Sequence, residues 1–225
     1  GFLLEQPAVE GLPASAGVFA AWVPDGGAVS DCAWFRGKWF DTLTTLWGHV
    51  AAGDVVSRPP HAVGKPGGGG SIYLPFRLPP GGTRTIELLF AWHVPRSDLR
   101  TGPADDAPAD ADAAPRHYVP WYATRFADVG EVVETWQERY DLLREETLRF
   151  SDCFHDTTLP PEAVEAVAAN LTILKSPTCL RQHDGRFWAW EGCCDCGGCC
   201  AGTCTHVWNY AQALPHLFPS LERGL

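Results

Sequence analysis

Short apolar runs separated by glycine and proline turns fill the first hundred residues. Residues 17–23 are rich in β-branched and aromatic side chains and stop at a Pro-Asp-Gly-Gly turn, which predicts a strand. Residues 71–78 follow a run of glycines, and their internal Pro75 favours an edge strand. Residues 85–94 form the strongest strand pattern, which Pro95 ends. Because no long helical pattern comes between these runs, we expect the C-terminal part of an antiparallel β-sandwich here.

In the second half of the chain, the spacing of the apolar residues becomes typical of a helix. Large apolar side chains recur every three or four positions over residues 129–150, which predicts an amphipathic helix that bridges two domains. A second helix is expected from Pro160, with proline and glutamate in its first turn, and a third from near Thr205. Residues 41–53 fit either a short helix or a strand. The predicted segments are the β-sandwich part at 1–100, an acidic mobile loop and connector at 101–128, a bridging helix at 129–156 and the start of an α-helical domain at 157–225.

Charge and composition narrow the classes of partner. Seventeen Lys and Arg against twenty-seven Asp and Glu give a net charge of −10, which repels phosphate backbones and predicts no nucleic-acid partner. No apolar run reaches the roughly 18–20 residues of a membrane span, and no signal-like segment opens the chain, so we expect a cytoplasmic protein without an integral membrane span. The chain lacks methionine and stops within a helix-like pattern, so we expect a fragment of a longer protein.

Six of the nine cysteines lie between residues 193 and 204. The pair Cys196 and Cys199 has zinc-ribbon spacing, and Cys204 with His206 could complete a tetrahedral site. A structural zinc site usually draws a second ligand pair from farther along the chain, and none is present here. Three interpretations stay open, namely small buried cysteines in a glycine-rich loop, a local disulfide, and zinc. We predict no metal and no cofactor, with zinc as the alternative.

Just before the cysteines, Glu191 lies between two nearby tryptophans and a glycine. Indole faces stack on sugar rings, and a carboxylate can attack or stabilise an oxocarbenium-like centre, so the pattern is typical of a sugar site. The structural alternative is a strand-to-loop turn with Trp188 or Trp190 in the core.

Three motifs stand out in the last third of the chain, namely Ser-Pro-Thr-Cys at 176–179, Asp-Gly-Arg-Phe-Trp-Ala-Trp-Glu-Gly-Cys at 184–193 and Gly-Thr-Cys-Thr-His-Val-Trp-Asn-Tyr-Ala-Gln-Ala-Leu at 202–214. Together they resemble the start of the catalytic domain of glycoside hydrolase family 116, the family of bile-acid β-glucosidase or non-lysosomal glucosylceramidase, in its microbial branch. The match is specific over residues 157–225. Less specific motifs, Thr-Leu-Thr-Thr-Leu-Trp at 42–47 and Ala-Trp-His-Val-Pro at 91–95, resemble the family's N-terminal β-sandwich.

The resemblance implies a β-sandwich followed by the first helices of an (α/α)6 toroid, in an enzyme that cleaves β-linked glycosides with retention. Glu191 matches the family's nucleophile, whereas the acid/base aspartate lies farther downstream than this chain extends. The family's sugar-binding aspartate, eleven residues after the nucleophile, is replaced by Gly202, or by Thr205 in a gapped alignment. Substrate contacts are therefore predicted for Trp190, Thr205, His206 and Asn209.

The sequence thus predicts part of a retaining β-glycosidase that is β-glucosidase-like or glucosylceramidase-like, with a small β-glycoside as its partner. The alternative is a non-catalytic carbohydrate-binding or zinc-stabilised scaffold in which Glu191 is structural. The fragment alone is expected to be inactive, because the resemblance leaves the acid/base residue outside it.

Overall fold

A computed structural model describes residues 1–65, 67–97, 119–176, 178–190, 203 and 214–224 of the 225-residue chain. The chain divides into two compact units, each of which is described by itself. The first contains Gly1–Pro7 and Gly17–His93, and the second contains Ala8–Ala16 and Val94–Leu225.

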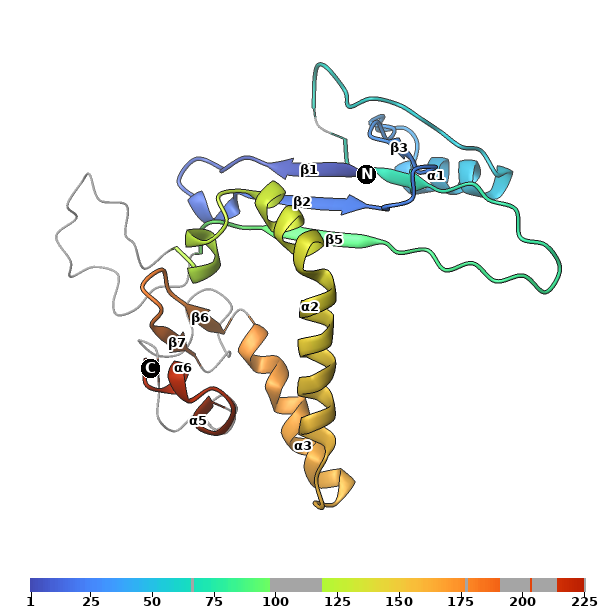
Figure 1. The fold of residues 1–225 in the computed structure, drawn as a ribbon. Helices are drawn as coiled ribbons and strands as arrows, with labels where there is room; N and C mark the ends of the chain where they lie inside the picture. The colour runs from blue at the N-terminus through green and yellow to red at the C-terminus, as the bar shows by residue number, and fades with distance from the viewer. Residues whose placement is uncertain (66, 98–118, 177, 191–202, 204–213, 225) are drawn as a thin grey trace. The chain divides into compact units, whose positions relative to one another are not determined.

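Small antiparallel sheets form the first unit. Strands β1 (Phe2–Gln6), β2 (Gly17–Trp22) and β5 (Leu89–His93) make one sheet in the order β1-β2-β5 (Figure 1). Strands β3 (Val29–Asp31) and β4 (Ser71–Tyr73) make a second, two-stranded sheet. On β5 the buried Ala91 and His93 alternate with the exposed Phe90 and Trp92, as expected for a sheet with two different faces. The Phe19 ring of β2 packs on the aromatic face, with its centroid 5.5 Å from Phe90 and 4.6 Å from Trp92.

The predicted strands are present, and two of them are shorter than predicted. Residues 17–23 give β2 almost unchanged. The run at 71–78 pairs only as far as Tyr73, because Pro75 has no N–H to donate to a sheet. The run at 85–94 pairs only from Leu89, because its partner β2 ends opposite, at Trp22.

The ambiguous segment at 41–53 is a helix, α1 (Thr42–Ala52). Its N-terminus is capped by the Asp41 carboxylate, which accepts hydrogen bonds from the backbone N–H groups of Leu43 at 3.3 Å and Thr44 at 2.9 Å. Its C-terminus is Gly53 at φ +72°, a left-handed conformation that costs glycine no Cβ clash. Two caps within thirteen residues therefore decide between helix and strand where the apolar pattern alone did not.

Helices dominate the second unit. The long predicted helix is α2 (Val129–His155), whose N-cap Asp128 accepts from the Glu131 backbone N–H at 3.1 Å. The predicted second helix is α3 (Pro161–Leu171), with Pro161 in its first turn. The other elements are the 3₁₀ helices η1 (Pro13–Ser15), η3 (Trp121–Thr124) and η4 (Thr172–Lys175), the strands β6 (Cys179–Arg181) and β7 (Phe187–Ala189), and the short helices α5 (Leu214–Leu217) and α6 (Pro219–Glu222).

The core of this unit lies where the β6–β7 hairpin packs against the C-terminal helices. Phe187, Ala189 and Leu214 are buried there, and the surrounding apolar side chains are Ile173, Leu174, Cys179, Phe218 and Leu221. The predicted third helix is seen only from residue 214 onward, since 205–213 lie outside the described residues. It stops at Leu217 and restarts at Pro219 as α6, as its prolines predicted.

Tyr122 of η3 joins two distant points of the same unit. Its hydroxyl accepts a hydrogen bond from the Val94 N–H at 2.9 Å and donates to the Val94 carbonyl oxygen. Burial raises the pKa of this phenol, although the Val94 N–H opposes the rise, so Tyr122 stays protonated and able to donate.

The architecture is therefore mixed, with small antiparallel sheets and helices. None of the described helices is both long and apolar enough to cross a membrane. The predicted acidic loop at 101–128 falls largely on residues outside the described part, which resumes at Val119.

Candidate functional site

Of the residues predicted to act on a substrate, the structure describes one, Trp190. The predicted nucleophile Glu191 and the predicted contacts Thr205, His206 and Asn209 lie outside the described residues. So do the alternative zinc ligands Cys196, Cys199 and Cys204. The described part of the candidate site is the β6–β7 hairpin, which leads directly to Glu191 in the sequence.

A tight turn joins the two strands of this hairpin. Gly185 is at φ +90°, which a side chain would strain, and the Gln182 N–H donates to the Arg186 carbonyl at 2.8 Å. The Asp184 carboxylate accepts from the Arg186 backbone N–H at 3.1 Å and from its Nε at 2.8 Å. The Asp-Gly pair at 184–185 is therefore a turn, and its carboxylate is committed to Arg186.

At the end of the hairpin opposite the turn, hydrogen bonds fix the backbone of Ala189 and Trp190, which precede Glu191 in the sequence. The Trp190 N–H donates to the Thr178 carbonyl at 2.9 Å, and the Thr203 N–H donates to the Ala189 carbonyl at 2.6 Å. Trp190 is 1% exposed and Ala189 is 0% exposed. Trp190 is thus a core tryptophan, as the structural alternative predicted, while the chain after it lies outside the described residues. The burial gives Trp190 a packing role, while its contact with a sugar stays a prediction.

Thr203 has an unusual backbone conformation. It is at φ +55°, in the left-handed region that β-branched residues avoid. Such a conformation costs about 1–3 kcal/mol and persists only where the surroundings impose it. Its bond to Ala189 is one such constraint, so strain is stored beside the strand end that precedes Glu191.

The segment before α2 lines the other edge of the hairpin. The His183 N–H donates to the Val119 carbonyl at 3.0 Å, and Pro120 bridges to Gln182. The Arg181 guanidinium lies 3.9 Å from the centroid of the Trp121 ring, which is a cation–π distance. The sequence analysis did not single out Arg181 or Trp121, because neither belongs to a spaced motif.

Buried polar atoms without a partner gather around this hairpin. They carry less than 1 Å² of exposed surface each and have no hydrogen-bond partner in the structure. Leaving such an atom unpaired costs about 1–3 kcal/mol, so a native site normally supplies water, a ligand or a further group. The atoms are Arg181 Nε, Gln182 Nε2, His183 Nδ1, Trp188 Nε1 and Thr203 Oγ1.

Cys179 on β6 is not a reactive thiol. Burial raises its pKa to about 11, and a hydrogen bond with Thr178 offsets only part of this rise. The thiolate is the form that attacks carbon or binds a metal, and it is scarce at neutral pH in such a group. Cys179 therefore acts as a small apolar side chain in the core.

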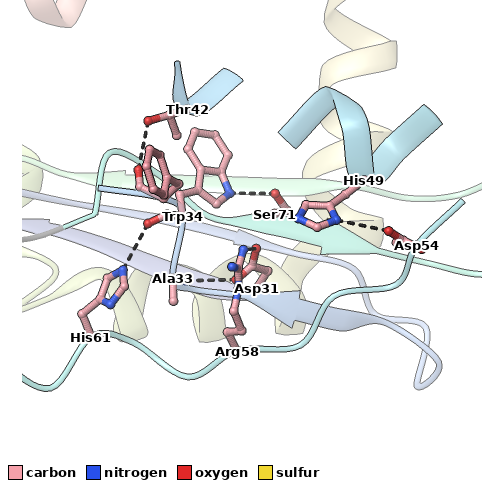
Figure 2. Close-up of polar contacts among 10 residues, drawn as sticks. Asp31, Ala33, Trp34, Thr42, His49, Asp54, Arg58, His61 and Ser71 are labelled. Carbon is pink, nitrogen blue, oxygen red and sulfur yellow. Dashed lines mark hydrogen bonds and ion pairs between the residues drawn. The ribbon is translucent and has the colours of Figure 1, made fainter. Parts of the chain in front are cut away.

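A second polar cluster lies in the first unit and is centred on Asp31 of β3 (Figure 2). Asp31 is 0% exposed, and its carboxylate accepts from Arg58 Nε at 2.9 Å and Arg58 Nη2 at 2.6 Å. The Ala33 N–H donates to it as well, at 3.1 Å. The hydrogen bonds from Arg58 lower the pKa of Asp31, so it stays ionised near neutrality and has no proton to give as a general acid.

Other polar side chains near Asp31 are also paired, except the buried hydroxyl of Tyr73 on the neighbouring strand β4, which has no hydrogen-bond partner. Trp34 Nε1 donates to Ser71 Oγ at 2.8 Å, and His61 Nε2 contacts the Trp34 carbonyl at 3.1 Å (Figure 2). His49 Nδ1 lies 3.2 Å from the Asp54 carboxylate at the C-terminal end of α1. These contacts tie loops to strands and indicate a structural role. A lone aspartate in the apolar run at 29–34 was the signal that the sequence analysis did not use.

Within the described ranges, no group of three or more His, Cys, Asp or Glu side chains is placed to hold a metal ion. The cysteine-rich segment lies outside those ranges, so the zinc alternative is neither supported nor opposed by this observation.

Comparisons with known proteins give no family. No protein-family model matches the chain, and no curated protein matches it. The resemblance to glycoside hydrolase family 116 therefore rests on the motifs quoted above.

Proposed function

We propose that this chain is part of a retaining β-glycosidase in which Glu191 is the nucleophile. One observation carries the proposal, namely the hydrogen-bonded and buried backbone at Ala189 and Trp190, directly before Glu191 in the sequence. A nucleophile must be held in line with the anomeric carbon, and a fixed strand end is suited to that task. The motif around Glu191 gives the second line of support.

In the proposed reaction the ionised Glu191 carboxylate attacks the anomeric carbon, and the bond to the aglycone oxygen breaks. A second carboxyl group, about 5 Å from the first, protonates that oxygen as it leaves. Water then hydrolyses the glycosyl-enzyme ester, and the second group takes a proton from the water. The resemblance assigns this acid/base role to an aspartate farther along than Leu225, and the proposed substrate is a β-glucoside or glucosylceramide-like glycoside.

Covalent labelling of the full-length protein tests the proposal. We expect a 2-deoxy-2-fluoro-β-glucosyl fluoride to add one glycosyl group, and peptide mass mapping to find it on the peptide that carries Glu191. Glu191→Gln should abolish the label and lower kcat/KM by about 10³-fold or more. The matched control is Glu165→Gln on the exposed side of α3, which should be labelled like the wild type.

Two other outcomes would contradict the proposal. Saturable binding of β-glucosides without an adduct would favour the carbohydrate-binding scaffold. One equivalent of zinc per chain, in a sample that is not labelled, would favour the zinc-stabilised scaffold.

A further inference from the structure

Helix α1 turns its apolar side toward solvent. Leu43, Trp47 and Val50 recur at the spacing of one helix face, and they are 62%, 69% and 49% exposed. Within this fully described helix no side chain is buried. A surface helix normally turns such a face toward the core, because burial of apolar surface is what holds the helix in place. The orientation of α1 is therefore the reverse of the usual one.

The opposite side of α1 is mainly polar, and its polar groups are paired within the chain. The Thr42 hydroxyl donates to the Phe35 carbonyl at 2.9 Å, and His49 Nδ1 lies 3.2 Å from the Asp54 carboxylate (Figure 2). Thr42 and His49 are both half-buried. Together with the two caps described above, these contacts hold the helix with its apolar side outward.

The exposed apolar surface continues just before the helix. Trp39 is 84% exposed and Phe40 is 55% exposed, and both directly precede the N-cap. With the three helix side chains they expose roughly 600 Å² of apolar surface, since one large aromatic side chain offers about 150–250 Å². A standard protein interface buries about 800 Å² on each partner. The area at α1 is therefore close to what one subunit of a dimer buries.

A large and a small residue lie next to each other on the exposed side of α1. Gly48 follows Trp47, and a Cβ placed on Gly48 would meet no atom within 4 Å apart from its own neighbours along the helix. Thr44 and Ala52, one turn before and one turn after Gly48, are also small and exposed. The bulky Trp47 side chain therefore projects beside a strip of small residues, which is a shape that a second copy of the same surface complements.

Antiparallel pairing about a two-fold axis fits these shapes. If the axis passes between positions 47 and 48, Trp47 of each copy lies opposite Gly48 of the other, and Leu43 lies opposite Ala52. Parallel pairing would instead place Trp47 against Trp47 and Gly48 against Gly48, which leaves a clash beside a void. The alternation of large and small residues therefore favours the antiparallel arrangement.

The charge of α1 also permits pairing with a second copy. Residues 42–53 contain no Asp, Glu, Lys or Arg, so neither copy buries an ion there. Of the flanking carboxylates, Asp41 accepts from the Thr44 N–H at 2.9 Å, and Asp54 contacts His49. Elsewhere a net charge of −10 makes two copies repel each other. A helix that lies on a membrane surface would instead carry Lys and Arg beside its apolar face.

We propose that two copies of this chain form a dimer through antiparallel packing of their α1 helices, with Trp47 of each copy against Gly48 of the other. The interface lies in the first unit and uses none of the predicted substrate residues, so it does not depend on the proposed function. Because its area is at the low end for stable complexes, we expect a dissociation constant on the order of micromolar.

Sedimentation velocity of the full-length protein, from about 1 to about 100 µM, tests the proposal because dimer formation depends on concentration. The wild type should change from monomer to dimer over this range. Trp47→Ala should weaken the dimer by about 30-fold or more, the factor that corresponds to a hot-spot residue. Gly48→Leu should also weaken it strongly, because the added side chain occupies the space that Trp47 of the other copy needs.

Gly48→Leu separates loss of the dimer from loss of folding. Leucine is a better helix former than glycine, and the site has open space for a Cβ, so the helix should be kept or stabilised, as circular dichroism can check. The double variant Trp47→Ala with Gly48→Leu should form more dimer than Gly48→Leu alone. In the double variant each introduced leucine faces an alanine, so the clash is removed.

Matched controls make similar changes at exposed sites outside α1. Leu159→Ala removes a side chain that is 60% exposed, and Ala163→Leu adds a leucine on the exposed side of α3. Both controls should form the dimer like the wild type. A wild type that stays monomeric up to about 100 µM, or a dimer that neither α1 variant weakens, would overturn the proposal. A monomer that floats with phosphatidylcholine vesicles, and loses them on Trp47→Ala, would also overturn it and assign this face to a membrane.

Discussion

The polar clusters at Asp31 and at the β6–β7 hairpin differ in how many of their buried polar atoms are hydrogen-bonded. Around Asp31, a fully buried carboxylate has three hydrogen bonds, and one nearby buried polar atom, the Tyr73 hydroxyl oxygen, has no partner. Around the hairpin, five buried polar atoms have no partner. The first cluster contains a buried charged group, yet the second contains more buried polar atoms without a hydrogen-bond partner.

This difference distinguishes the two clusters more clearly than the types of residue in them do. A satisfied buried network rigidifies a fold, whereas buried donors left unpaired reduce stability unless something else binds them. By residue type alone, the aspartate, histidines and arginine of the first cluster look more catalytic than a glutamine and a tryptophan. The hydrogen-bond pattern shows instead that most of the unpaired buried atoms lie at the hairpin.

The largest effect is expected from Arg58→Ala. Removing Arg58 leaves the Asp31 carboxylate buried and without its counterion, which should lower the free energy of unfolding by about 3 kcal/mol. Urea denaturation of the two proteins measures the difference. The control is Arg77→Ala on an exposed stretch, which should change stability by less than about 0.5 kcal/mol.

The pH dependence of this stability difference tests whether the ion pair is its cause. The pKa of Asp31 is lowered in the folded state, so its contribution is complete above the unfolded pKa of about 3.9 and is lost as pH falls toward the folded value. In Arg58→Ala, burial without the counterion raises the pKa of Asp31, so the stability difference should be largest near neutral pH and narrow as the pH falls through the acidic range. A difference that stays constant down to pH 2 would exclude the ion pair as its cause.

An intermediate effect of opposite sign is expected from Thr203→Gly. Glycine adopts the left-handed conformation at φ +55° without a Cβ clash, and the backbone bond to Ala189 is kept. The free energy of unfolding should rise by about 1 kcal/mol, measured by thermal denaturation. Thr83→Gly, at an exposed threonine without a positive φ, should instead lower it slightly. Equal effects of the two changes would contradict the assignment of strain to Thr203.

The smallest effect on stability is expected from Gln182→Met. A buried amide nitrogen that lacks a partner gives little to the folded state, so replacing Gln182 with an apolar side chain of similar size should be neutral within about 0.5 kcal/mol or slightly stabilising. Urea denaturation in the absence of sugar measures this. A loss of 2 kcal/mol or more would mean that Gln182 belongs to a satisfied network like that of Asp31.

Local patterns predicted much of the secondary structure. The β-branched run of β2 and the helical period of α2 were sufficient because each element is long or strongly patterned. The short strands β6 and β7 were not predicted, since three residues carry no measurable period and their pairing depends on the Asp-Gly turn between them. The sandwich and the toroid remain proposals, because they depend on packing between distant elements.

In the candidate site too, local sequence patterns could be used for prediction, whereas features that depend on folding could not. The role of Glu191 was predicted from a local motif, a glutamate beside tryptophans and a glycine, and it stays a prediction. Gln182 could not be predicted in this way, because its importance comes from burial and from a missing partner, and both arise only when the hairpin folds. The pairing of Asp31 with Arg58 spans twenty-seven residues and leaves no sequence pattern.

The hydroxyl of Tyr122 fixes the ends of a loop independently of what lies between them. Because it bonds both backbone groups of Val94, the chain must return to the same place after residues 95–121. The entropy of closing such a loop grows with the logarithm of its length, by about 0.6 kcal/mol for each doubling. The bonds from Tyr122 to Val94 therefore hold the two ends of this connection together within one unit.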